Sequence, residues 1–130
     1  YFKQVAVNRK MTDYSNFPIE IIPCVTVREK DGLALSSRNV RLTQAQRIEA
    51  LFIYESLVLV QHLAHKMLPK ELKNQIEDLY KESSLKLEYI EFVDSNSFEI
   101  LNEEWTPEAV ACVVAYVNDV RLIDNMRVFA

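Results

Sequence analysis

Residues 109–117 read AVACVVAYV, an almost unbroken apolar run that is rich in β-branched residues. A short run of this kind is typical of a strand that is covered on both faces. Asn118 and Asp119 follow it as a turn pair, and VRLIDNM (120–126) continues with a strand pattern. We therefore expect 109–117 to be the central strand of a small sheet, with 120–126 beside it.

The elements that precede this run complete an α+β pattern. LKLEYIEFVD (85–94) alternates between apolar and polar residues and predicts a third strand. Thr43 and Gln46 form a capping box, after which apolar residues recur at helical spacing to about His65. Pro69 fits the first turn of a second helix. We expect two main helices packed on a small, mostly antiparallel sheet of about three strands.

The first third of the chain gives weaker signals. Residues 1–12, YFKQVAVNRKMT, are compatible with a helix, and FPIEIIPCVTV (17–27) is β-branched but broken by Pro18 and Pro23, which restrict strands to short pieces. A turn follows at 29–32, EKDG, and its flanks VTVR and LAL are expected to form two strand arms. The turn contains the only glycine of the chain.

Composition excludes several classes of protein. At 130 residues the length suits one domain, or one domain with part of another. One glycine excludes the glycine-rich phosphate loops. The net charge of −4 argues against a nucleic-acid partner. LFIYESLVLV (51–60) contains Glu55 and is too short to cross a membrane, so we expect no membrane partner.

The two cysteines indicate a compartment. Cys24 and Cys112 show no metal-binding spacing and no secretory signal accompanies them, so we expect reduced, buried thiols and a cytoplasmic protein. His62 and His65 are three positions apart, but no third ligand completes a set, and we predict no metal site. Asp124 has the position of a strand-end cap, with a catalytic acid as the less common alternative.

One polar cluster carries candidate chemistry. Ser36, Ser37, Arg38 and Asn39 follow one another, with Arg28 close by in the sequence. Hydroxyls, backbone N–H groups and a guanidinium together suit the oxygens of a phosphate. Short runs of this composition are also common in solvated loops that lead into a helix. From the residues alone, both interpretations stay open.

The longer segment around this cluster resembles a known family. REKDGLALSSRNVRLTQAQR (28–47) is similar to the signature region of pantothenate synthetases, the pantoate–β-alanine ligases. Further similar segments keep the same order: RKM with IEIIP before the signature, then EYIEFVD (88–94) and RLIDN (121–125). The resemblance covers essentially the whole chain.

The resemblance implies a two-domain enzyme of which this chain is the C-terminal portion. Residues 1–35 would be the tail of a Rossmann-like nucleotide-binding domain that carries a histidine motif, and residues 36–130 a C-terminal lid domain. ATP, with Mg²⁺, would adenylate (R)-pantoate, and β-alanine would then displace AMP to give pantothenate. The partners implied are these small molecules, the N-terminal domain of the same enzyme and a second copy in a homodimer. The chain alone is expected to be inactive.

The family's functional positions can be carried over by residue. Gln4 matches the glutamine that holds pantoate, and the backbone of Val27 matches a contact to adenine. The family's ATP loop matches Leu35, Ser36, Ser37 and Arg38. Of these, Ser36, Ser37 and Arg38 would be catalytic, because their donors stabilise the charge on the departing pyrophosphate.

Two positions depart from the family pattern, and one alternative remains. Tyr1 stands where the family has an aspartate, and Lys3 where it has the first of two glutamines. The alternative, from another class, is a non-catalytic α+β domain that uses the same loop to bind an anion or a protein. The sequence upstream of this chain would discriminate between them, because only the ligase requires a histidine motif there.

Overall fold

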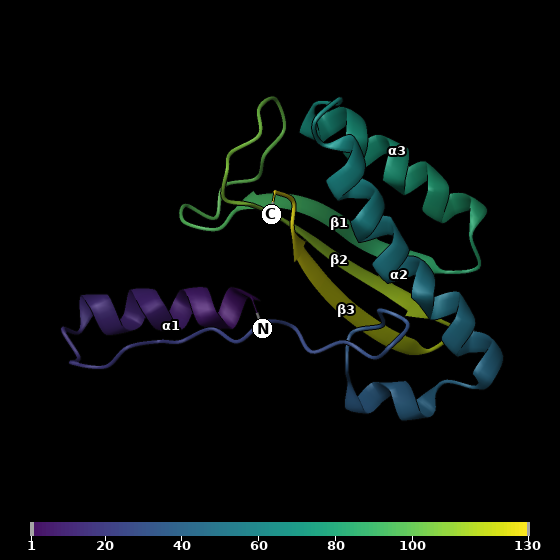
Figure 1. The fold of residues 1–130 in the computed structure, drawn as a ribbon, viewed down its shortest axis with the longest axis horizontal. Helices are drawn as coiled ribbons and strands as arrows, with labels where there is room; N and C mark the ends of the chain where they lie inside the picture. Colours follow the sequence, from purple (N-terminus) through teal and green to yellow (C-terminus); the bar gives the residue numbers. More distant parts are fainter. Residues whose placement is uncertain (1, 130) are drawn as a thin grey trace.

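The structure is a computed structural model that describes residues 2–129, so Tyr1 lies outside the described residues. Along the chain the elements are α1 (Phe2–Tyr14), the 3-10 helix η1 (Ser37–Arg41), α2 (Gln44–Leu63), α3 (Pro69–Glu82), β1 (Lys86–Asp94), β2 (Ala109–Val117) and β3 (Val120–Arg127). Figure 1 shows a body made of α2, α3 and the sheet, with α1 extending to one side of it. The predicted α+β architecture is confirmed.

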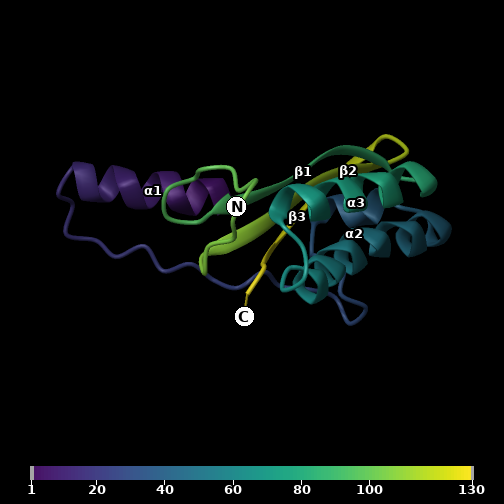
Figure 2. The same cartoon turned by 90° about the horizontal axis from the view of Figure 1, so that it is seen from above.

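The sheet is antiparallel, and within residues 2–129 its order is β1-β2-β3. The prediction that 109–117 is the central strand is therefore confirmed. Val113 lies opposite Ile90 on one side and Asp124 on the other. Residues paired in this way point to the same face of a sheet. Val113 and Ile90 both belong to the hydrophobic core, so this is the face on which α2 and α3 lie (Figure 2).

Local signals explain where the two core helices begin. The backbone N–H of Gln46 donates to Thr43 Oγ1 at 3.3 Å, and the N–H of Thr43 donates to Gln46 Oε1 at 2.9 Å, which completes the predicted capping box. Pro69 opens α3, where it needs no hydrogen-bonded N–H. Both helices therefore start where the sequence places them.

The helices bury one side against the sheet and against each other. α2 contributes Ile53, Leu57 and Val60, each at most 2% exposed. From α3, the hydroxyl of Tyr80 lies 3.0 Å from Ser56 Oγ on α2, in the buried seam between the helices. This pair satisfies two polar groups that would otherwise be costly to bury.

The expected strands in residues 17–27 are not present. The segment has no regular structure, and the two arms around the turn reduce to a single bridge between Arg28 and Ala34. A strand needs a neighbouring strand for its backbone hydrogen bonds. Ile22 and Val25 are instead 74% and 89% exposed. The β-branched residues of this segment thus favour a strand, but no strand within residues 2–129 pairs with it.

Two smaller findings concern α1 and the cysteines. α1 was expected over 1–12, and it runs to Tyr14 with most side chains exposed. Cys24 is exposed, which corrects the expectation that it is buried, because its segment does not enter the core. Cys112 is largely covered, and burial raises the pKa of its thiol to about 11. No helix within residues 2–129 has the length and apolar character that crossing a membrane requires.

Candidate functional site

The turn before the polar cluster is closed by backbone hydrogen bonds. The N–H of Gly32 donates to the carbonyl of Glu29 at 3.0 Å, and the N–H of Glu29 donates to the carbonyl of Leu33 at 2.9 Å. Gly32 has a φ of +97°, which a residue with a Cβ rarely adopts. The N–H of Leu35 then donates to the carbonyl of Val27 at 2.9 Å. The chain therefore doubles back on itself immediately before Ser36.

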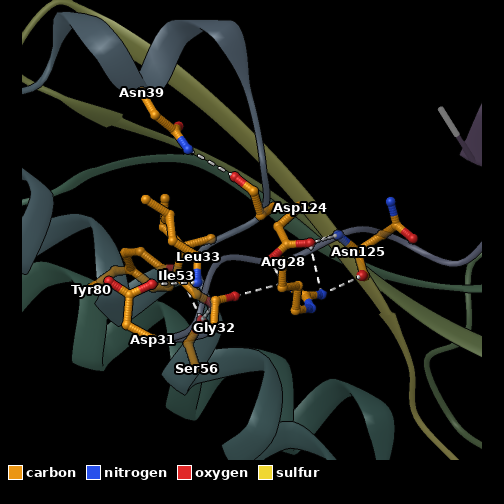
Figure 3. Close-up of polar contacts among 11 residues, drawn as sticks. Arg28, Asp31, Gly32, Leu33, Asn39, Ile53, Ser56, Tyr80, Asp124 and Asn125 are labelled. Carbon is orange, nitrogen blue, oxygen red and sulfur yellow. Dashed lines mark hydrogen bonds and ion pairs between the residues drawn. The ribbon is translucent and has the colours of Figure 1, made fainter.

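Arg28 fastens this turn to β3 (Figure 3). Its Nη1 donates to Asp124 Oδ2 at 2.6 Å and its Nη2 to Asp124 Oδ1 at 3.0 Å. The same two nitrogens donate to the carbonyls of Gly32 at 3.1 Å and Asn125 at 3.2 Å. The guanidinium lies over the ring of Tyr54 on α2, 4.9 Å from its centroid. One side chain thus joins the turn, the last strand and α2.

The other side of the turn is held from α2 and η1. Arg47 forms ion pairs with Glu29 at 2.8 Å and with Asp31 at 2.7 Å. Asn39 Nδ2 donates to the carbonyl of Ala34 at 3.1 Å and to Glu29 Oε1 at 3.0 Å. The segment that leads to the polar cluster is therefore anchored on both sides.

The cluster itself stands at the start of η1. Ser36 caps this helix, because its Oγ accepts from the N–H of Arg38 at 3.2 Å. Arg38 Nη1 donates to the carbonyl of Arg121 on β3 at 3.2 Å. Ser37, Arg38 and Leu35 are exposed, and Ser36 is half-buried. The loop presents the Ser37 hydroxyl and the Arg38 guanidinium on the surface, and both are donors that suit phosphate oxygens.

Arg121 is itself fixed by a cross-sheet ion pair. Its Nε and Nη2 donate to the carboxylate of Glu88 at 2.7 and 2.9 Å. These hydrogen bonds hold the pKa of Glu88 below its ordinary value. The strand end on which Arg38 rests is therefore braced from β1.

A depression of about 480 Å³ adjoins the loop, and its lining residues are Arg28, Glu29, Lys30, Asp31, Leu35 and Arg47. It shares Leu35 with the predicted ATP loop. It is open to solvent, and its two carboxylates, those of Glu29 and Asp31, are paired with Arg47.

Of the remaining predicted site residues, Val27 lies beside this cluster and Gln4 lies apart from it. Val27 directly precedes Arg28, and its carbonyl is taken by Leu35. Gln4 is exposed in the first turn of α1, which Figure 1 shows away from η1. The structure thus brings Leu35, Ser36, Ser37 and Arg38 together, with Val27 adjacent.

The histidines have other neighbours. His62 Nδ1 donates to the carbonyl of Val58 at 2.8 Å, and the ring of His65 lies 5.1 Å from that of Phe129. Among residues 2–129 no three His, Cys, Asp or Glu side chains form a group that could hold a metal ion.

The structure corrects the expectation that Asp124 is a strand-end cap. It lies inside β3, is 4% exposed and is paired with Arg28. The alternation of β3 held a signal, because Val120, Leu122 and Asp124 share one face and the first two are apolar. A carboxylate on an inward face needs a cation. Arg28 therefore serves Asp124, not the hydroxyls of the loop.

Comparison with known proteins supplies the context. A family model described as pantoate-beta-alanine ligase matches residues 1–127. Pantothenate synthetases of Bacteroides fragilis and Porphyromonas gingivalis are 40% and 41% identical over 128 residues. Each match covers 97% of this chain but only 45% and 46% of the relative. The chain thus spans a little under half the length of the curated relatives it matches.

Solved structures agree with the sequence matches. The pantothenate synthetase of Thermus thermophilus is similar with a TM-score of 0.88 and 32% identity, over 99% of this chain and 47% of that one. A pantoate-beta-alanine ligase of Francisella tularensis, complexed with beta-gamma ATP and beta-alanine, is similar with a TM-score of 0.60 and 27% identity, over 98% and 40%.

Proposed function

The chain belongs to the pantoate-beta-alanine ligase family, and from this we propose that it is the C-terminal portion of an enzyme that uses ATP to join pantoate to β-alanine. The proposal concerns the longer protein, because this chain corresponds to a little under half of its relatives. For residues 1–130 alone we propose negligible turnover, since the family's histidine motif does not occur in this sequence.

The observation that carries the proposal is that Ser36, Ser37 and Arg38 lie together on an anchored loop, with the Ser37 hydroxyl and the Arg38 guanidinium exposed. In the first step a pantoate carboxylate oxygen bonds to the α-phosphorus of ATP while the bond to the β-phosphate breaks and pyrophosphate leaves. Fixed donors that face the departing pyrophosphate stabilise its developing charge. In the second step the amine of β-alanine attacks the acyl carbon, loses a proton and displaces AMP.

The other assignments follow from the family. We propose that Gln4 binds pantoate, that the backbone of Val27 contacts adenine and that Leu35 borders the nucleotide. The ligand named for the Francisella tularensis structure supports the use of ATP. The described residues offer no cluster for Mg²⁺, so none of them is assigned to that ion.

We also propose that residues 1–35 complete a Rossmann-like domain and that residues 36–130 form a lid over it. The exposed large apolar side chains concentrate before the lid: Val7, Met11, Tyr14, Phe17, Ile19, Ile22, Val25, Val27 and Leu35. Such a concentration favours contact with a further domain. Leu33 is 4% exposed and belongs to the hydrophobic core of the lid. Residues 28–35 are therefore the segment that connects the two proposed units.

A cytoplasmic location is proposed with the function. Cys24 and Cys112 are both unpaired, which is typical of proteins from a reducing compartment.

The test is Arg38→Ala in the full-length protein, with Arg41→Ala as matched control. Arg41 is an exposed arginine of the same 3-10 helix and pairs with Asp119. Pantoate-dependent exchange of labelled pyrophosphate into ATP measures the first step. We expect Arg38→Ala to lower its rate about 10²–10³-fold, as for loss of one charge-stabilising donor.

Arg41→Ala is expected to change the rate less than about threefold, because exposed ion pairs contribute little. Equal losses in both variants, or a loss explained by a lower melting temperature, would contradict the proposal. Nucleotide binding without any exchange in the wild type would favour the non-catalytic anion-binding domain instead.

A further inference from the structure

We propose that Arg28 and Asp124 act as positioning residues, which hold the Ser36–Arg38 loop at the angle that the adenylation step requires. The inference rests on the proposed function and adds to it two residues that act by holding the loop, not by contact with the reacting groups. We call the pair the clamp.

The clamp combines a bidentate ion pair with hydrogen bonds to two backbone carbonyls. Both terminal nitrogens of Arg28 donate twice, to the two Asp124 oxygens and to the carbonyls of Gly32 and Asn125. Asp124 Oδ1 also accepts from the N–H of Asn125 at 2.7 Å. The side chains are 19% and 3% exposed. A bidentate, water-shielded pair fixes orientation as well as distance.

The position of the clamp allows it to orient the loop. Arg28 begins the segment and meets β3 at Asp124, while Arg38 ends it and meets β3 at Arg121. These two points on β3 are three residues apart, or about 10 Å along a strand. The attachment to β3 therefore fixes the positions of both ends of the segment 28–38 relative to each other.

The two ends are not equally firm. Arg38 makes one exposed hydrogen bond to a carbonyl, which a ligand phosphate can replace. The clamp is largely shielded from water, so a ligand cannot replace its contacts in the same way. The geometry thus assigns the fixed end of the loop to Arg28 and Asp124, and the mobile donor to Arg38.

Stability alone does not account for such a pair. A buried ion pair is often replaced by apolar residues of similar volume with no loss of stability, whereas an apolar pair cannot reproduce a bidentate orientation. This difference separates a positioning role from a merely structural one.

The experiment uses the full-length protein with the double substitution Arg28→Met/Asp124→Leu. We expect a melting temperature near that of the wild type, a kcat for pantoate-dependent adenylation lowered about 10–100-fold, and a KM for ATP changed less than about threefold. The kcat effect is the size that misplacement by about 1 Å produces. Rates of pantoate-dependent pyrophosphate exchange are expressed per folded molecule.

The matched control is Lys73→Met/Glu91→Leu, which removes another half-buried ion pair, between α3 and β1, away from the loop. It is expected to leave kcat within about twofold of the wild type. A control effect as large as that of the clamp variant overturns the proposal, and so does a wild-type kcat in the clamp variant.

If the double variant does not fold, Arg28→Lys carries the test. It keeps the charge and loses the planar fork. We expect kcat to fall about tenfold at an unchanged KM for ATP, and a wild-type kcat overturns the clamp. Absence of adenylation in the wild type would instead refute the proposed function, and the clamp with it.

Discussion

At the scale of single residues, Gly32 shows how tightly the turn is fitted. Its φ of +97° lies in the left-handed region, and a Cβ built on it would overlap the ring of Tyr54. The same ring carries the guanidinium of Arg28. The only glycine of the chain thus lies where the turn, the aromatic ring and the clamp meet.

We therefore expect Gly32→Ala to lower the free energy of unfolding by about 2–4 kcal/mol. About 1 kcal/mol comes from the strained φ and the rest from overpacking against Tyr54. Urea denaturation of the two proteins measures the difference.

A double-mutant cycle with Tyr54→Ala separates the two causes. In that background Gly32→Ala should cost only about 1 kcal/mol, because the ring is gone. An unchanged cost would show that the ring imposes no steric limit on this glycine.

At the scale of elements, the seam between α2 and α3 contains a titratable group. Burial raises the pKa of Tyr80 to about 12, in spite of its hydrogen bond to Ser56. The folded state thus disfavours the phenolate, which the unfolded chain forms at its ordinary pKa of about 10. The contribution of Tyr80 to stability is complete below about pH 10 and is lost between about pH 10 and 12.

We expect the free energy of unfolding to fall by about 3 kcal/mol across that interval because of Tyr80. In Tyr80→Phe this part of the decrease should disappear. Tyr14→Phe is the control, since Tyr14 is 92% exposed and its removal should leave the pH curve unchanged. Stability curves from chemical denaturation at successive pH values give the comparison, and parallel curves for Tyr80→Phe and the wild type would refute it.

The sequence predicted those elements whose signals are local. The capping box at Thr43, the proline at the head of α3 and the apolar run of β2 each act within a few residues, and each element starts accordingly. The strand pattern of 17–27 misled for a physical reason, since propensity cannot supply a partner strand.

The same distinction between local and long-range signals applies to the candidate site. Ser36 and Arg38 are two positions apart, so the sequence alone predicts that they lie close together. The contact of Arg38 with Arg121 could not, because it depends on how η1 lies against β3. The pairing of Asp124 with Arg28 could not be predicted either, because 96 residues separate the two.

At the scale of the whole molecule, the described residues divide into a well-packed body and an open N-terminal part. The body contains the sheet of β1, β2 and β3, while 20–27 have no regular structure and exposed apolar side chains. In the 130-residue chain we expect amides of β2 to exchange only through global unfolding and those of 20–27 to exchange almost unprotected.

The full-length protein should protect 20–27 at least about tenfold more, if a further domain covers this segment. Hydrogen exchange followed by mass spectrometry on both proteins gives the comparison, with β2 as the internal control. Equal exchange of 20–27 in both proteins would argue against the proposed domain contact.

The span of the clamp along the chain has a consequence for how the protein is made. Arg28 and Asp124 are 96 residues apart, whereas β1, β2 and β3 join as successive hairpins. Contacts of long sequence separation form late, because a large loop must close first. At about 5–20 residues per second, a ribosome needs roughly 5–20 s after Arg28 to reach Asp124. During synthesis, the Ser36–Arg38 loop is thus among the last parts of residues 2–129 to take its final form.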